Sequence, residues 1–598
     1  HGTIGWFCLP DYDGAPLFGA LLDAHKGGFW RLGPAHPTFG KQHYWKDSAV
    51  LVTRWTTPRG ELELTHAMAW PEDERGRQRE PRRVLLRRLR CTNGQAECRL
   101  EFWPRYDFEQ PATVSGDETG LSVQAGDHNL AFWTDAAFET QEHGASGAFR
   151  LKEGDECWAI LTLDERPAAW SASWANQVLE QSNGYWQEWL ERITYTGPRS
   201  KQVRRSALTI HLLSYAPKSS LVAAPTTSLP ERIRGERNYD YRYAWVRDAS
   251  LSIAILSLLG DTGSAKRYMD WLAQLGSSNE MLLQVVYRIN GGTDLTQQKR
   301  WAPSGYRGSR PLHIGNHAYK QRQLDSLGYL ADCMWIYLEQ GGEWKDAYWR
   351  LVERIAAYTA ATWQQPDHSI WELSTKAQYV SSKAMAWVTL ERTVHIAEHL
   401  CQPAPVDNWR AEMERIHAEV MEQGWSEKQG AFRQRYGSEH LDAAALLIPI
   451  MGFLPPDHPR VLSTVERIAE ALTIEDFVYR YHPIKAEGHP DVPLPDLEGA
   501  FLPCTFWLAA VYAMIDQPDA AEKILQAAEA VAGEVGLFAE EVDARDKQFL
   551  GNSPLLFSQA EYVRAIMELA KVRPVDKARL AVGKVAQKLD DLFPAKGS

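Results

Sequence analysis

Two neighbouring stretches decide the fold of this chain: residues 157–163 (CWAILTL) and residues 174–193 (WANQVLEQSNGYWQEWLERI). The first is one of several short apolar runs that are typical of β-strands. In the second, apolar residues recur every three to four positions, which is the period of an amphipathic α-helix. We therefore expect β-structure before a boundary near residues 165–200 and helices after it.

The N-terminal part repeats the strand pattern. Short runs at residues 49–55, 84–91 and 98–103 alternate apolar and polar positions and are separated by Gly, Asp and Asn. This spacing predicts an antiparallel β-sandwich over residues 1–170. Cys91 and Cys98 flank Asn93-Gly94 and could face each other across a hairpin, but two reduced thiols in strands are the favoured interpretation.

Twelve helical segments are expected after the boundary. Short connections lead into every odd-numbered segment, and connections of roughly 16–40 residues lead into every even-numbered one. Because short links make neighbouring helices antiparallel, a closed ring of six hairpins would place every long loop at one end. The segments span residues 199–217, 247–259, 262–276, 319–340, 345–362, 382–400, 405–423, 440–451, 459–473, 500–516, 518–532 and 557–571.

This alternation predicts an (α/α)6 barrel over residues 199–575, with a helical linker at 171–198 and a C-terminal tail at 576–598. A superhelical solenoid would instead require similar sequence in successive hairpins, and the segments show no such self-similarity. The chain is therefore expected to be a multidomain β + α protein, with the sandwich followed by the barrel.

Charge and composition exclude several classes of function. The formal net charge is −12, so nucleic acid and anionic membranes are not expected partners. No apolar run approaches the ~20 residues of a transmembrane helix. The seven cysteines are scattered without C-x-x-C spacing, which indicates neither a zinc site nor a disulfide framework. We expect a cytoplasmic protein rather than a secreted one.

The connection before the second barrel helix suits a sugar. Residues 238–248 (NYDYRYAWVRD) combine four aromatic side chains with two Arg and two Asp. Aromatic planes pack against the apolar faces of a pyranose, and charged groups bond its hydroxyls. The alternative is structural, with Asp248 capping a helix that begins at Ala249 and Arg247 paired at the surface.

The connection at residues 301–316 (WAPSGYRGSRPLHIGN) is rich in glycine and basic residues. It matches neither the P-loop nor G-x-G-x-x-G and follows no predicted strand, so nucleotide binding is not expected.

Two other long connections offer carboxylates. Residues 370–372 (IWE) carry Glu372, and residues 536–543 (GLFAEEVD) carry Glu540 and Glu541. Glycosidic cleavage needs a carboxylic acid that protonates the leaving oxygen and a second carboxylate that activates water or attacks the sugar. Burial beside Trp371 would raise the pKa of Glu372 and favour the acid role.

Several motifs in order resemble glycoside hydrolase family 15, the glucoamylase family, in its bacterial and archaeal two-domain form. The resemblance covers nearly the whole chain and implies a sandwich followed by an (α/α)6 catalytic domain. The motifs are residues 2–10 (GTIGWFCLP), 240–249 (DYRYAWVRDA), 306–311 (YRGSRP), 314–316 (IGN), 370–372 (IWE), 382–387 (SKAMAW) and 498–507 (EGAFLPCTFW).

The resemblance also assigns roles by position. Glu372 resembles the general acid and Glu540 the general base, with Glu541 as the alternative base. Residues that resemble the walls of the terminal-glucose subsite are Arg247 and Asp248, which grip hydroxyls, Trp371, Arg480, Tyr243 and Trp245. The family's reaction requires neither a metal nor an organic cofactor.

The activity implied is that of an inverting, exo-acting hydrolase that releases β-D-glucose from the non-reducing ends of α-linked gluco-oligosaccharides. A trehalase and an isomaltose-type α-1,6-glucosidase of the same family are alternatives. A phosphorylase on a similar scaffold and a non-catalytic, sugar-binding regulatory module are further ones. The expected partner is a small α-glucoside, and assembly into a homo-oligomer stays open.

Overall fold

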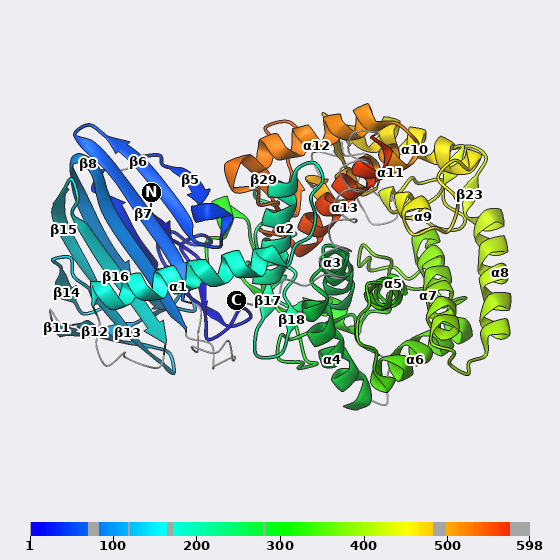
Figure 1. The fold of residues 1–598 in the computed structure, drawn as a ribbon, viewed down its shortest axis with the longest axis horizontal. Coiled ribbons are helices and arrows are strands. Elements are labelled where there is room, and N and C mark those ends of the chain that lie inside the picture. Colours follow the sequence, from blue (N-terminus) through cyan, green and yellow to red (C-terminus); the bar gives the residue numbers. More distant parts are fainter. Residues whose placement is uncertain are drawn as a thin grey trace, which may run out of the picture. The chain divides into compact units, whose positions relative to one another are not determined.

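A computed structural model describes residues 2–36, 38–69, 83–117, 120–163, 171–278, 283–481 and 498–573. The chain forms two compact units (Figure 1). The first contains residues up to 191 together with 300–312, and the second contains residues 192–299 and those from 313 onward. Helix α1 (Ala172–Glu191), expected as a linker, belongs to the first unit. The tail expected at residues 576–598 lies outside the described residues.

The first unit contains two antiparallel sheets that share one long strand, as the sandwich prediction requires. One sheet runs in the order β14 (Glu139–Gln141), β15 (Gly144–Lys152), β8 (Val84–Trp103), β4 (Phe29–Pro34) and β1 (Thr3–Ile4). The other runs in the order β11 (Thr113–Asp117), β12 (Gly120–Ala125), β13 (His128–Thr134), β16 (Glu156–Leu163), β8, β7 (Gly60–Met68), β6 (Leu51–Thr57) and β5 (Lys41–Tyr44). Shorter strands are β2 (Phe7–Leu9), β3 (Ala15–Phe18), β9 (Arg105–Tyr106) and β10 (Gln110–Pro111).

The hairpin considered at Asn93-Gly94 is wrong, because strand β8 runs straight through these residues. Its first half pairs with β7 and β16, and its second half pairs with β4 and β15. A register shift opposite Glu61 and the positive φ of Gly94 (66°) mark the irregularity where the strand passes from one sheet to the other. Cys91 and Cys98 are buried free thiols within this one strand, as the favoured interpretation predicted.

The core of the sandwich explains the uninterrupted apolar run in β16. Phe102 of one sheet stacks on Phe132 of the other, with ring centroids 4.3 Å apart. On β16, Leu161 faces this core, whereas Trp158 and Ile160 face a second cluster that includes side chains of α1. Both faces of the strand are therefore covered, and no position needs to be polar.

The second unit confirms the double ring of helices. The inner helices contact one another in sequence order around a closed circle, and each outer helix packs on an inner one. The inner ring consists of α3 (Val246–Leu258), α5 (Asp325–Glu339), α7 (Val380–His399), α9 (Leu447–Ile450), α11 (Leu502–Met514) and α13 (Leu556–Val572). The outer ring consists of α2 (Ser200–Leu212), α4 (Thr262–Ser278), α6 (Asp346–Thr362), α8 (Val406–Gln423), α10 (Pro459–Leu472) and α12 (Pro518–Ala532).

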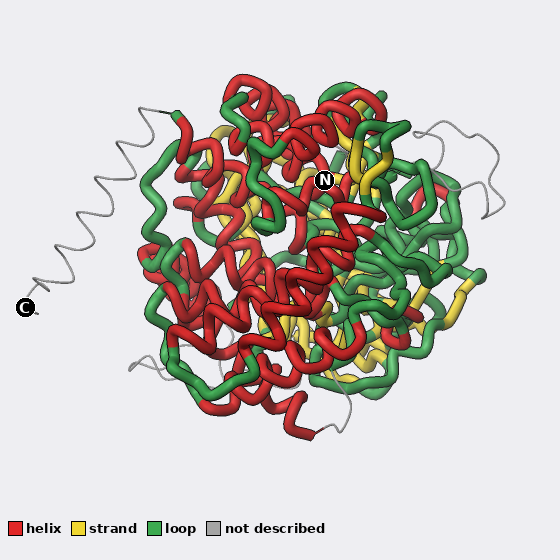
Figure 2. The backbone as a smooth tube through the Cα atoms, turned by 90° about the vertical axis from the view of Figure 1, so that its right-hand side faces the viewer, coloured by secondary structure: helices red, strands yellow, loops and turns green. Residues whose placement is uncertain are grey.

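The long connections lead into the inner helices, and Figure 2 shows many of these loops, in green, gathered on one side of the red helices. The helix expected at 440–451 is mostly a 3₁₀ turn, Ala443–Leu446, followed by the single turn of α9. Short strands pair within the loops: β17 (Ser214–Tyr215), β18 (Ser220–Leu221), β19 (Ala244–Trp245), β20 (Val286–Tyr287), β21 (Gln298–Arg300), β22 (Leu312–Ile314), β23 (Trp425–Ser426), β24 (Ala431–Phe432), β25 (Thr473–Ile474), β26 (Phe477–Val478), β27 (Ala500–Phe501), β28 (Glu541–Val542) and β29 (Phe549–Leu550).

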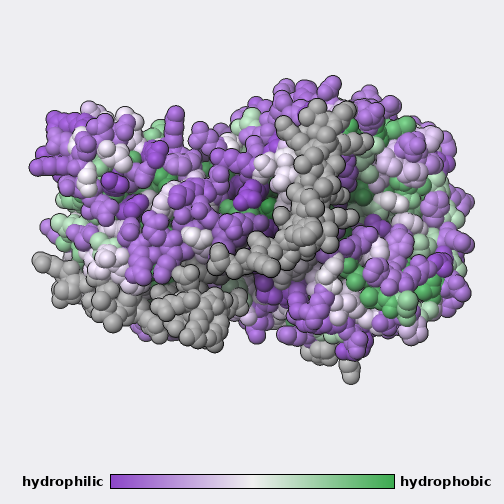
Figure 3. All heavy atoms as spheres, in the orientation of Figure 1, coloured by the Kyte–Doolittle hydropathy of each residue, from purple (hydrophilic) through white to green (hydrophobic). Residues whose placement is uncertain are grey.

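Hydrophilic residues predominate on the face drawn in Figure 3, and green, hydrophobic areas on it are small. Large hydrophobic side chains that are exposed in the described part of the chain are Phe39, Met68, Trp301 and Leu462. Among the described helices, none is both long and apolar enough to cross a bilayer.

Candidate active site

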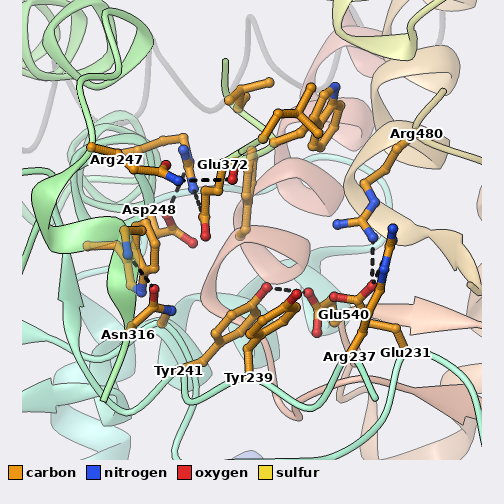
Figure 4. Close-up of a pocket in the computed structure, with 18 of the residues that line it drawn as sticks. Glu231, Arg237, Tyr239, Tyr241, Arg247, Asp248, Asn316, Glu372, Arg480 and Glu540 are labelled. Atoms are coloured by element: carbon orange, nitrogen blue, oxygen red, sulfur yellow. Dashed lines mark hydrogen bonds and ion pairs between the residues drawn. The ribbon is translucent and has the colours of Figure 1, made fainter. Parts of the chain in front are cut away.

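A cavity of about 360 Å³ lies in the second unit, among the long connections (Figure 4). Five of the six connections that enter inner helices contribute lining residues in the described structure. Residues predicted from the sequence that line it are Trp245, Arg247, Asp248, Trp371, Glu372, Arg480 and Glu540.

Tyr243 does not line the cavity, so its expected place in the wall is wrong. The side chain is 1% exposed and packs with Trp245 in a buried cluster. Its hydroxyl accepts a hydrogen bond from the backbone N–H of Gly315 (3.0 Å). Tyr241, two residues earlier, lines the cavity instead, together with Tyr239 and Trp245.

Residues 300–312 also differ from the expectation that the whole 301–316 loop belongs with the barrel. They fold with the first unit, where the backbone N–H of Ser304 donates to Asp23 (2.9 Å). Of the motif around this loop, only the end lies at the cavity, through Asn316 and the residues that follow it.

Arg247 and Asp248 lie in the first turn of α3. The helix begins at Val246 with Trp245 at its N-cap, so Asp248 is inside the helix and does not serve as its cap. Both residues are 5% exposed. Nε of Arg247 lies 3.3 Å from Oδ2 of Asp248, and Nη1 lies 3.3 Å from Oδ2 of Asp325. No sequence pattern pointed to Asp325, because an acidic residue in the first turn of a helix is common.

The Asp248–Arg247 contact leaves hydrogen-bonding capacity for a ligand. Within the described residues, neither Oδ2 of Asp248 nor Nε of Arg247 makes a hydrogen bond, although both atoms are buried and their groups form an ion pair. Buried polar atoms are rarely left in this state unless a ligand or water completes them. The two atoms lie 3.3 Å apart, too close for a hydroxyl between them, so a sugar hydroxyl, which both donates and accepts, would reach the pair from the cavity that both residues line.

Glu372 is held in a strained backbone position beside Arg247. Its φ is 58°, a left-handed conformation that costs energy for a residue with a side chain and that is often found at functional sites. Oε1 lies 3.1 Å from Nη2 of Arg247, and a quarter of the side chain is exposed to the cavity. Burial raises the pKa of Glu372 to about 7, although Arg247 opposes this shift.

Glu540 is 1% exposed and is oriented by two donors. The hydroxyl of Tyr241 donates to Oε1 (2.6 Å), and the backbone N–H of Asn552 donates to Oε2 (3.2 Å). Burial, followed by the negative charge of Glu231, raises the pKa of Glu540 to about 8, while the bond from Tyr241 and the charge of Arg480 oppose the rise.

Glu541 points away from the cavity. It belongs to a buried group of three carboxylates, Glu231, Glu498 and Glu541, whose oxygens lie within 4.8 Å of one another. Arg480 already supplies a cation to all three, with Nη2 at 2.8, 2.6 and 3.4 Å from them respectively. The two neighbouring glutamates therefore point to opposite sides of the chain where β28 begins. Glu540 points toward the cavity, and Glu541 points toward Arg480.

Trp371 is fixed by a residue that sequence reasoning missed. Its indole Nε1–H donates to both carboxylate oxygens of Asp442, at 2.9 and 3.0 Å. The ring also meets Phe501 edge-on, with centroids 5.5 Å apart. Asp442 comes from the connection before α9, the one long connection that contributes no lining residue in the described structure. This loop therefore acts on the site through Trp371.

Glu231 lines the cavity and likewise had no signal in the sequence. It is 3% exposed and pairs with Arg480. Figure 4 shows Arg247, Asp248 and Glu372 on one side of the cavity, with Glu540, Glu231 and Arg480 on the other. Carboxylates from separate loops thus face a common space, as glycosidic chemistry requires.

Comparison with known proteins gives two family matches. The model described as "Glycosyl hydrolases family 15" matches residues 197–567, and the model described as "Trehalase-like, N-terminal" matches residues 1–148. The chain is 33% identical over 597 residues to a trehalase of Mycobacterium tuberculosis, covering 95% of this chain and 87% of the relative. It is 30% identical over 587 residues to a trehalase of Thermoplasma acidophilum, covering 95% and 97%.

A solved structure shares the two-part fold. A bacterial glucoamylase complexed with acarbose superposes with a TM-score of 0.71 at 13% sequence identity, covering 96% of this chain and 92% of that chain. At this identity the likeness shows the architecture of sandwich and barrel, and nothing finer.

Proposed function

The chain belongs to glycoside hydrolase family 15, and from this premise we propose that it is a trehalase, which hydrolyses trehalose to two glucose molecules with inversion at the attacked carbon. The observation that carries the proposal is that Glu372 and Glu540 line one cavity together with the buried pair Arg247 and Asp248. This combination supplies an acid, a base and a site for sugar hydroxyls.

The choice of substrate departs from the first expectation. The sequence favoured α-linked gluco-oligosaccharides, with trehalose as an alternative. Relatives named trehalases are 30–33% identical to this chain over nearly its whole length, and this similarity supports the alternative instead. The chemistry is the same in both cases, since each substrate is an α-glucoside.

In the proposed reaction, the closed end of the cavity receives one glucosyl unit, whose hydroxyls bond to Arg247 and Asp248. Glu372 donates a proton to the bridging oxygen as the C1–O bond breaks. A water molecule attacks C1 from the opposite face and gives a proton to Glu540. Inversion requires the two carboxyl groups to be about 6.5–9.5 Å apart, so that this water fits between base and sugar.

Near neutral pH the two glutamates together carry one proton. Burial causes this, because it raises the pKa of Glu372 to about 7 and that of Glu540 to about 8. These values leave the shared proton mainly on Glu540 in the free enzyme, whereas the productive arrangement has it on Glu372. Hydrogen bonds from Tyr241 and from the N–H of Asn552 favour the ionised form of Glu540, and so does the charge of Arg480.

The test follows the anomers released from trehalose by proton NMR, at a rate faster than mutarotation. Inversion yields one β-glucose from the attacked unit and one α-glucose from the leaving unit, in equal amounts. A retaining enzyme would yield α-glucose alone. Maltose and isomaltose serve as comparison substrates. Hydrolysis of these without hydrolysis of trehalose would overturn the trehalase assignment, and inactivity on all three would favour a non-catalytic module.

A further inference from the structure

The cavity has a closed end and an open rim, and the exposure of its lining residues separates the two. Arg247, Asp248 and Glu540 are at most 5% exposed, whereas the side chain of Arg237 is 35% exposed and His317 is also exposed. A substrate that places its reacting glucosyl unit at the closed end must place the rest of the molecule against the rim. The rim therefore contacts the leaving group.

Arg237 is the cationic side chain of this rim that is best fixed in position. Its Nη1 lies 2.5 Å from Oε2 of Glu498 and 3.6 Å from Oε2 of Glu231. The loop behind it is closed by a hydrogen bond from the N–H of Glu231 to the carbonyl of Arg237 (3.2 Å). Within the described residues, its other two side-chain nitrogens make no hydrogen bond or ion pair. The guanidinium is thus held at one nitrogen and keeps donors for a ligand.

An aromatic surface lies two residues away. Tyr239 lines the cavity and is half-buried, and its ring stacks on His313 with centroids 5.4 Å apart and planes 22° from parallel. In Figure 4, Arg237 lies beside Glu231, and Tyr239 lies beside Tyr241, between the groups on the two sides of the cavity. A flat ring beside a fork of donors suits a pyranose, whose face is apolar and whose edge carries hydroxyls.

We propose that Arg237 determines specificity for the leaving group, by donating hydrogen bonds to hydroxyls of the second glucose of the substrate, with Tyr239 beneath that ring. Glu498 and Glu231 act as positioning residues that aim the guanidinium. The inference rests on the proposed hydrolysis of an α-glucoside whose leaving group is itself a sugar. An aglycone without hydroxyls would gain nothing from Arg237.

Two substrates that share the glucosyl unit and differ in the leaving group test this role. Trehalose has a glucose leaving group, whereas α-glucosyl fluoride has fluoride, which offers no hydroxyl. We expect Arg237→Ala to lower kcat/KM for trehalose about 10- to 100-fold, the range for a lost hydrogen bond to a charged group. The same variant should keep kcat/KM for α-glucosyl fluoride within about threefold of wild type.

Two further variants control for charge and for folding. Arg237→Lys keeps the charge but loses the planar fork, so its kcat/KM for trehalose should fall between those of wild type and Arg237→Ala. Arg467→Ala removes an arginine that lies on the outer helix α10 and is paired with Glu470. This variant should leave kcat/KM unchanged for both substrates. Circular dichroism and thermal unfolding identify a variant that fails to fold, in which case Arg237→Lys carries the comparison alone.

An equal loss with both substrates would overturn the inference, because Arg237 would then act on the glucosyl unit or on the catalytic groups. Unchanged kinetics with trehalose would overturn it as well. Failure of the proposed function gives a different result: wild-type enzyme would hydrolyse α-glucosyl fluoride and leave trehalose intact.

Discussion

Gly551 leaves the space that the carboxylate of Glu540 occupies. A Cβ atom added at Gly551 would lie 2.3 Å from Oε2 and 2.6 Å from Cβ of Glu540, and the residue has a φ of 69°. Because no side chain fits there, Glu540 is held between this glycine and its two hydrogen-bond donors. Gly499 has the corresponding relationship with Glu541, whose Cβ would be 2.8 Å away.

The two glycines give a matched pair of substitutions. Gly551→Ala should displace Glu540 and lower kcat by about 100-fold, since misplacement of a catalytic group by about 1 Å has an effect of this size. Gly499→Ala should displace Glu541 and leave kcat within a few-fold of wild type. Steady-state kinetics of both variants decide the matter, and the reverse order of effects would make Glu541 the base.

Direct replacement of the acidic groups tests the same assignment without steric strain. Glu372→Gln and Glu540→Gln should each lower kcat by roughly 10²–10⁴-fold, the usual contribution of a general acid or base. Glu541→Gln should lower it much less, because its carboxylate does not reach the cavity. Comparable losses in all three variants would contradict the distinction between Glu540 and Glu541.

The pH dependence of kcat/KM follows from the two raised pKa values. The pair must carry one proton, so activity should fall below pH about 7, where both groups become protonated, and above pH about 8, where both ionise. We expect a bell-shaped profile with its maximum between these values. Glu231→Gln should move the profile to lower pH, since loss of that negative charge lowers the pKa of Glu540. A maximum near pH 4–5 would show that both carboxyl groups titrate as they do in water.

Asp442 should matter for turnover although it does not touch the cavity. Asp442→Ala leaves the buried indole N–H of Trp371 without its acceptor and should lower kcat about tenfold, in line with a lost hydrogen bond to a charged group. Asp442→Asn keeps one acceptor oxygen and should retain most of the activity. Equal losses in the two variants, measured at matched folded fractions, would argue against positioning through this bond.

Arg87 is expected to stabilise the first unit and to have no effect on catalysis. It is fully buried, donates to the carbonyl of Trp30 (3.0 Å) and to that of Gly2, and lies over the Trp30 ring. Arg87→Ala removes both hydrogen bonds and opens a cavity, so the free energy of unfolding should fall by about 2–4 kcal/mol. Urea unfolding measures this, with the exposed Arg90 on the same strand as the control substitution.

The regular parts of the fold were readable from the sequence because their signals are local. The 3.6-residue period located the barrel helices, and the alternation of short and long connections predicted a closed double ring with the long loops at one end. The course of β8 was not readable, since Asn93-Gly94 suits a hairpin and a bulge equally well and only pairing with β4 and β15 decides between them.

The same limit applies to the cavity. Arg247, Asp248, Glu372 and Glu540 stand in motifs with chemical meaning, and their residue types alone made them candidates. Asp325 and Asp442 carry no such signal, because an acidic residue before or within the first turn of a helix is ordinarily a cap or a solvated charge. Glu231 carries none either, because it stands in a long loop, where an acidic residue is ordinarily a solvated charge. Their roles depend on which distant side chain each one meets in the folded barrel.

The placement of residues 300–312 in the first unit has a consequence for the order of events during synthesis. More than a hundred residues of the second unit, 192–299, leave the ribosome before this segment does. The first unit therefore cannot finish folding when only residues 1–191 have been synthesised. The contacts of Asp23 with Ser304 and of Asp107 with Arg300 form only after residues 300–312 have emerged. For the same reason, a fragment of residues 1–191 would lack residues 300–312 of its own unit, and a fragment that begins at residue 192 would carry these residues without the unit in which they fold.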